Sequence, residues 1–107
     1  MVIYYHPVSR QIRYYERMEK YPYLNEAVAS VLARRRAELA MSKKRLSEQA
    51  FIERAYITGL EAGKWNVTLN VLFYLCDALD MVPVDFIREV MAEREKLHAG
   101  EEERRTR

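Results

Sequence analysis

The sequence predicts an all-α domain of five short helices preceded by a tyrosine-rich arm. Apolar residues recur at spacings of three and four from residue 28 onward, which is a helical period. Small polar residues and a proline stand where successive helices would begin, and no clear core strand interrupts them. The chain has 107 residues, 50% of them hydrophobic. It is therefore long enough to bury one core without disulfides or metals.

The first two helices are predicted from their capping residues. Asn25 is the expected N-cap of the first helix, because asparagine accepts a hydrogen bond from a free backbone N–H. Ser42 is expected to cap a second helix over residues 43–50 in the same way. The periodic positions of the first helix are Val28, Val31, Leu32, Arg35, Arg36 and Leu39.

The last three helices have similar boundary signals. The third is expected to begin at Ile52 or Glu53 and to stop at Gly63, since glycine adopts the left-handed conformation that ends many helices. Thr68 is expected to cap the fourth helix, and Pro83 to start the fifth. The expected apolar faces are Leu69, Leu72, Leu75, Cys76 and Leu79 in the fourth helix, and Val84, Ile87, Val90 and Met91 in the fifth.

The two ends of the chain differ from this helical region. Residues 1–23 hold six of the eight tyrosines, and we expect them to form an arm with a short strand over residues 2–5 and a short helix up to Lys20. Residues 24–97 would form the domain, and residues 98–107 a polar, flexible tail that frays. Tyr4 and Tyr5 are candidates for contacts with a second copy or another protein; the alternative is an arm folded over its own domain.

Composition excludes several classes of protein. No apolar run reaches the length of a membrane span, and the N-terminus lacks the pattern of a signal peptide, so we expect a cytoplasmic protein without membrane contact. His6 and His98 have no second ligand at metal spacing, and no serine, histidine and acid combination suggests catalysis. We therefore expect no metal, cofactor or enzymatic activity, and Cys76 should be a buried, inert thiol.

Residues 43–60 have the spacing of a helix-turn-helix. Leu46, Ala50, Ile57 and Leu60 fall where two crossed helices must bury apolar groups. Ser47 is small, as a close crossing requires. In such a motif the second helix can enter the DNA major groove. The alternative is a helical hairpin without a nucleic-acid role.

Basic charge is concentrated beside this motif, although the net charge is only +2. Residues 34–45 hold six basic residues against one glutamate; the six are Arg34, Arg35, Arg36, Lys43, Lys44 and Arg45. This run is a candidate phosphate-facing edge. The alternative is an ordinary solvated helix face.

About residues 27–88 resemble the Cro and phage-repressor type of helix-turn-helix protein, the Xre family. The matching positions are Arg36, Leu46, Ser47, Ile57, Glu61, Gly63, Asn66 and Leu79. The resemblance implies a lambda-repressor-like DNA-binding domain. It also implies an ion pair between Arg36 and Glu61 that orients the recognition helix, because an arginine fork can hold a carboxylate through two hydrogen bonds.

The resemblance places the recognition helix at about residues 53–61. Its expected base-facing residues are Arg54, Ala55, Tyr56 and Thr58, with Arg54 suited to guanine. Ser42 and Lys43, at the start of the preceding helix, would bind phosphate. The loop residues Lys64, Trp65 and Asn66 would contact the backbone further along, with a place in the core as an equal alternative for Trp65.

Three residues depart from the family pattern. Phe51 replaces the glycine usual in the turn, where a positive φ is needed. Glu53 brings a negative charge close to where phosphates would lie. Gly59 loosens the recognition helix by about 1 kcal/mol relative to alanine and removes a possible base contact.

These observations favour a sequence-specific DNA-binding transcriptional regulator, with repression as the expected output. It would bind double-stranded DNA at a palindromic operator as a homodimer, since two-fold dimers match two half-sites. The candidate dimer residues on the fifth helix are Phe86, Ile87, Val90 and Met91. The alternatives are the antitoxin of a toxin–antitoxin pair, whose arm covers a toxin, and a protein-interaction module that has lost DNA binding.

Overall fold

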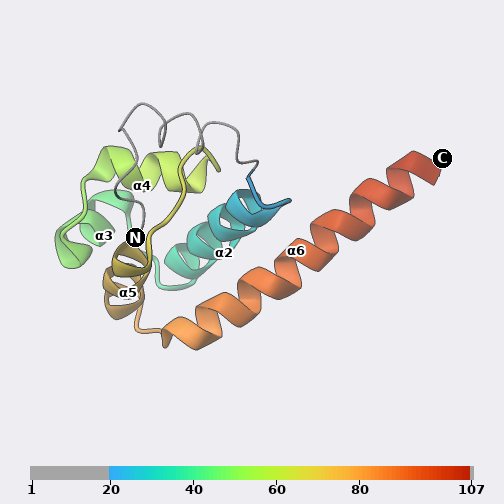
Figure 1. The fold of residues 1–107 in the computed structure, drawn as a ribbon. Coiled ribbons are helices and arrows are strands. Elements are labelled where there is room, and N and C mark those ends of the chain that lie inside the picture. The colour runs from blue at the N-terminus through green and yellow to red at the C-terminus, as the bar shows by residue number, and fades with distance from the viewer. Residues whose placement is uncertain (1–19, 107) are drawn as a thin grey trace, which may run out of the picture.

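The computed structural model describes residues 20–106, which form five helices and no strand. Numbered as in Figure 1, they are α2 (Leu24–Glu38), α3 (Lys43–Ala50), α4 (Arg54–Glu61), α5 (Leu69–Ala78) and α6 (Pro83–Thr106). The predicted all-α fold is confirmed. The predicted strand and short helix of the arm, with Tyr4 and Tyr5, lie outside the described residues.

The core draws on all five helices. α2 packs against both α4 and α6, α3 against α4 and α5, and α5 against α6 (Figure 1). The largest fully buried side chains are Leu32, Leu46, Ile57, Leu60, Leu75, Leu79 and Phe86. Each contributes about 1.5–3 kcal/mol by leaving water. No charged or polar side chain within residues 20–106 is fully buried, so apolar packing holds the helices together.

Two predicted helix caps are present as hydrogen bonds. Ser42 Oγ accepts from the backbone N–H of Arg45 at 3.0 Å, and Thr68 Oγ1 accepts from that of Val71 at 3.2 Å. Pro83 is the first residue of α6. Gly63, with φ of 73°, follows the end of α4. The boundaries of α3 and α5 are therefore confirmed at their N-termini.

The start of α2 differs from the prediction. The helix begins at Leu24, and the residue at its N-cap is Tyr23, which has a φ of 62°. Asn25 lies inside the helix, where its side-chain amide donates to Asn66 Oδ1 at 2.8 Å. Because the helix begins one residue before it, Asn25 is not at the cap position. Similarly, α4 begins at Arg54, and the side chain of its N-cap residue Glu53 makes no capping bond.

The end of α6 also differs. The helix continues past His98 to Thr106, so residue 98 does not mark a helix end. Most residues of this stretch are good helix formers, and Arg104 pairs with Glu101 at 3.0 Å, one turn apart. In Figure 1 this end of α6 extends away from the other helices. None of the described helices is both long and apolar enough to span a membrane.

In α5, one residue of the predicted apolar face is exposed, and the predicted burial of the cysteine thiol is confirmed. Leu69, at the first turn of α5, is 69% exposed rather than part of the core. Cys76 is buried, and burial raises the pKa of its thiol to about 11. A thiol that stays protonated at neutral pH is a poor nucleophile.

Candidate nucleic-acid interface

Helices α3 and α4 form the predicted pair with a tight turn between them. Leu46 of α3 and Ile57 of α4 are fully buried. The hydroxyl of Ser47 donates to the carbonyl of Ile52 and so closes the turn. Phe51, at the turn itself, has a φ of 58°. The turn therefore keeps the left-handed conformation, although a side chain there costs about 1–2 kcal/mol relative to glycine.

The outer face of α4 displays three of the four residues predicted to read bases. Arg54, Ala55 and Thr58 are exposed, whereas Ile57 and Leu60 face the core. Residues four apart lie on the same side of a helix, so Arg54 and Thr58 are neighbours. The outer side of α4 is thus exposed and can contact a ligand, and the opposite side anchors the helix in the core.

Tyr56 differs from the prediction. Its ring is half-buried against the core. Its hydroxyl donates to the backbone carbonyl of Asn66 at 2.7 Å. In this structure Tyr56 holds the loop after α4 rather than extending from the outer face.

The loop that holds Lys64, Trp65 and Asn66 is fixed at several points. The backbone N–H of Lys64 donates to the carbonyl of Gly59 at 2.9 Å, and the side chain of Asn66 accepts from Asn25. All three loop side chains are exposed, Trp65 by 52%. Trp65 is therefore not a buried core residue, and its indole instead lies against Gly59 of α4.

The predicted pair between Arg36 and Glu61 is present with both hydrogen bonds. Arg36 Nε donates to Glu61 Oε2 at 2.7 Å, and Nη2 donates to Oε1 at 2.9 Å. Nη1 donates to the carbonyl of Met41 at 2.8 Å. The bond to Glu61 raises the pKa of Arg36 above its usual value. This bidentate pair ties α2 to the end of α4 and so orients the outer face of α4.

The other two arginines of the same run also have partners within the chain. Arg34 pairs with Glu89 at 3.1 Å and with Glu93 at 3.2 Å, both on α6. Arg35 donates to the carbonyls of Leu79 and Asp80 at 3.0 and 3.1 Å. These contacts join α2 to α6 and to the end of α5. The guanidinium groups of Arg34, Arg35 and Arg36 are therefore held within the chain, which argues against the expected phosphate-facing edge for this half of the basic run.

The other half of the run remains available. Lys44 and Arg45 are exposed and Lys43 is half-buried. None of the three forms an ion pair with another residue in the part of the chain that the structure describes. Lys43 opens α3 directly after the cap Ser42, where free backbone N–H groups favour a negative ligand.

The four candidate dimer residues of α6 separate into two pairs. Phe86 and Val90 are buried in the core at 1% and 5% exposure, so they are not part of a surface patch. Ile87 and Met91 are 41% and 59% exposed. The reason is geometric: a helix that packs on the core along one side buries only the residues on that side.

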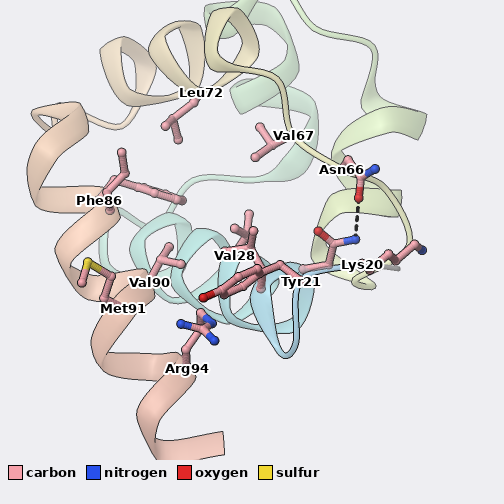
Figure 2. A pocket seen from close by; sticks show the side chains of 13 residues that line it. Lys20, Tyr21, Val28, Asn66, Val67, Leu72, Phe86, Val90, Met91 and Arg94 are labelled. Atoms are coloured by element: carbon pink, nitrogen blue, oxygen red, sulfur yellow. Dashed lines mark hydrogen bonds between the residues drawn. The ribbon is translucent and has the colours of Figure 1, made fainter. Parts of the chain in front are cut away.

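Ile87 and Met91 border an apolar groove of about 730 Å³ (Figure 2). The start of α2, the segment at residues 66–67 and α6 enclose this groove. Tyr21 lies at its edge with its ring over Arg94, whose Cζ is 4.5 Å from the ring centroid. Arg94 also donates to the carbonyl of Pro22 at 3.0 Å, which fixes the start of α2 against α6.

This arrangement defines a class of protein: a helix-turn-helix DNA-binding regulator. Residues 31–90 match the Cro/C1-type helix-turn-helix DNA-binding domain, and the chain belongs to that family. The departures at Phe51 and Gly59 lie within the matched residues.

Solved structures of the same kind support this assignment. The chain is similar to the clp gene regulator ClgR from Corynebacterium glutamicum, with 26% identity and a TM-score of 0.74 over 78% of this chain and 88% of that one. It is also similar to the restriction-modification controller protein C.Esp1396I, with 27% identity and a TM-score of 0.65 over 73% of this chain and 99% of that one. A further structure of C.Esp1396I, 26% identical over 71% of this chain and 97% of that one, shows a tetramer with its natural 35 base-pair operator, at a TM-score of 0.63. No curated protein matches the sequence.

Proposed function

We propose that this regulator is a homodimeric repressor that reads a palindromic operator in the cytoplasm and catalyses no reaction. The observation that carries the proposal is the outer face of α4. It leaves Arg54, Ala55 and Thr58 exposed while its opposite side is locked into the core. A helix held in this way can enter the major groove without rearranging the domain.

The exposed side chains of α4 have complementary chemistry for base edges. The guanidinium of Arg54 can donate two hydrogen bonds to O6 and N7 of guanine. The methyl group of Ala55 suits the methyl group of thymine, and the Thr58 hydroxyl can both donate and accept. Arg54 is the strongest of the three candidates for setting the sequence.

Phosphate contacts would come from both ends of the motif. Ser42 and Lys43 begin α3, and Lys64 and Asn66 follow α4. Lys43 and Lys64 are free of ion pairs with other described residues. Such contacts fix the register of the protein on the duplex without reading sequence.

The second copy would bind at α6. Ile87 and Met91 are exposed beside the apolar groove. Val84, one turn before Ile87, is 51% exposed and extends the apolar stripe. A two-fold interface uses the same patch on both copies. The tetramer of C.Esp1396I on its operator supports an oligomeric mode of binding. We also propose the arm, including Tyr4 and Tyr5, as a contact with a second copy or with a partner protein.

The test is selection from a random-duplex library at two salt concentrations, followed by sequencing of the retained DNA. A palindromic site with two half-sites about one helical turn apart is the expected result. Weak binding that salt abolishes, without an enriched sequence, would contradict the proposal and favour a protein-interaction module.

The Arg54→Ala variant tests the reading role within that experiment. It should lose preference at one base pair in each half-site, at a cost of about 1–3 kcal/mol for the original operator. Lys44→Ala, at an exposed basic residue of α3 without a predicted base contact, is the control and should keep the preference. An unchanged preference in Arg54→Ala would remove Arg54 from the reading residues.

A further inference from the structure

Gly59 occupies a position on the recognition helix where a base-facing side chain would be expected. It lies four residues after the exposed Ala55, hence one turn further along the same outer side of α4. Yet Gly59 is buried, unlike Ala55 and Thr58. The side chain that covers Gly59 therefore belongs to a residue outside α4.

The cover is the indole of Trp65. A methyl group placed on Gly59 would overlap the Nε1 and Cδ1 atoms of the Trp65 ring. These overlapping atoms belong to a large planar ring held in a short loop, so a small adjustment cannot remove the overlap. The absent side chain of Gly59 therefore makes the recess in which the indole sits.

We propose that Trp65 is a specificity-determining residue that contacts base edges from the loop, in the place that a side chain at position 59 would otherwise fill. The inference rests on the proposed function and deepens it: residue 65 belongs to the sequence-reading surface rather than to the phosphate contacts. The expected ligand group is the methyl of a thymine, because the indole offers a broad apolar edge.

The exposure of the ring fits this role. Trp65 is 52% exposed although part of it covers Gly59, so a large apolar surface remains open next to the outer side of α4. A packing role alone would not require an aromatic ring left half in water on the face that meets DNA.

The loop is also fixed before any ligand arrives. The N–H of Lys64 donates to Gly59, the hydroxyl of Tyr56 donates to Asn66, and the amide of Asn25 donates to Asn66. These bonds hold the residues on both sides of Trp65. A side chain whose orientation is set in advance loses less entropy on binding, so it can discriminate between bases.

The test is to displace the ring in two independent ways and to compare the selected DNA sequences. Trp65→Ala removes the indole, and Gly59→Ala pushes it out of its recess. Both variants should lose preference at the same base pair, which differs from the one that Arg54→Ala affects. The expected loss is about tenfold in affinity for the original operator.

Two further variants test whether the aromatic ring itself makes the contact. Trp65→Phe keeps an apolar ring and should retain part of the preference. The double variant Gly59→Ala with Trp65→Ala should lose no more affinity than either single variant, because both changes remove the same interaction. Thermal unfolding followed by circular dichroism identifies any variant that fails to fold, and Trp65→Phe then carries the test.

Three results distinguish this inference from the proposed function. If Trp65→Ala weakens binding equally for all sequences, Trp65 is a packing or phosphate residue and the inference is wrong. If Trp65→Ala and Trp65→Phe keep both affinity and preference while Arg54→Ala changes them, the inference is wrong and the proposed function stands. If the unaltered chain enriches no sequence at all, the proposed function fails first.

Discussion

The chain carries two basic clusters that look alike in the sequence and differ in their contacts within the chain. The first, at the end of α2, is Arg34, Arg35 and Arg36, and the second, at the start of α3, is Lys43, Lys44 and Arg45. Every arginine of the first cluster donates to groups of its own chain. The side chains of the second make no ion pair with the rest of the described region. Local charge alone therefore does not identify a DNA-facing surface.

The difference follows from what lies opposite each cluster. The end of α2 faces the ends of α4 and α5 and the side of α6. Carbonyls at a helix C-terminus lack partners within the helix, and Arg35 supplies donors to Leu79 and Asp80 at the end of α5. At the start of α3, by contrast, two of the three basic residues, Lys44 and Arg45, are exposed to solvent. We expect these cations to bind phosphates.

The largest effect is expected from Arg36→Ala. This change leaves the Glu61 carboxylate, whose side chain is only 8% exposed, without its partner. We expect the free energy of unfolding to fall by about 2–4 kcal/mol, as for a broken, partly buried ion pair. Arg36→Lys should recover part of this loss, because it keeps the charge but not the two-pronged geometry. Denaturant unfolding measures both variants, and a loss below about 0.5 kcal/mol, typical of a surface pair, would contradict the structural role.

Arg35→Ala should have an intermediate effect. It removes the donors to two carbonyls at the end of α5, and we expect a loss of about 1–2 kcal/mol in unfolding free energy. The matched control is Arg45→Ala, which removes an exposed arginine of the second cluster and should change stability by less than about 0.5 kcal/mol. Equal losses in the two variants would remove the distinction between the clusters.

Arg34→Ala should have the smallest effect of the first cluster on stability. Its side chain is 41% exposed, and its partners Glu89 and Glu93 are 44% and 15% exposed, so water screens the Glu89 pair most strongly. We expect a loss of up to about 1 kcal/mol that shrinks as salt is added. Unfolding curves at low and high salt test this expectation; a loss that persists at high salt would indicate a stronger link between α2 and α6.

The parts of the fold that depend on local signals could be predicted from the sequence. Ser42 and Thr68 cap their helices because the capping bond spans only three residues. The pairing of Arg36 with Glu61 was available only through the family resemblance, since the two residues are 25 positions apart. The partners of Arg35, 44 and 45 positions away, had no signal in the sequence.

Features that depend on three-dimensional packing were missed or misplaced. Phe86 and Val90 belong to the same apolar stripe as Ile87 and Met91, and a stripe does not tell which of its sides faces the core. In the sequence Gly59 suggested a looser helix and a lost base contact but not a recess, because the recess exists only when the loop brings Trp65 onto it. The N-cap expected at Asn25 is absent because α2 begins earlier, at Leu24, with Tyr23 at its N-cap; the Asn25 amide instead donates to Asn66, 41 positions away.

The most direct test of the contrast is the salt dependence of operator binding, measured for the unaltered chain, Lys43→Ala and Arg34→Ala. The structure predicts that Lys43→Ala weakens binding to all sequences alike and lowers the slope of log affinity against log salt by about 0.9 for each phosphate that is no longer neutralised. Arg34→Ala should leave the slope unchanged, since its guanidinium is held by Glu89 and Glu93. A slope that falls with Arg34→Ala and not with Lys43→Ala would contradict the assigned roles of the two clusters.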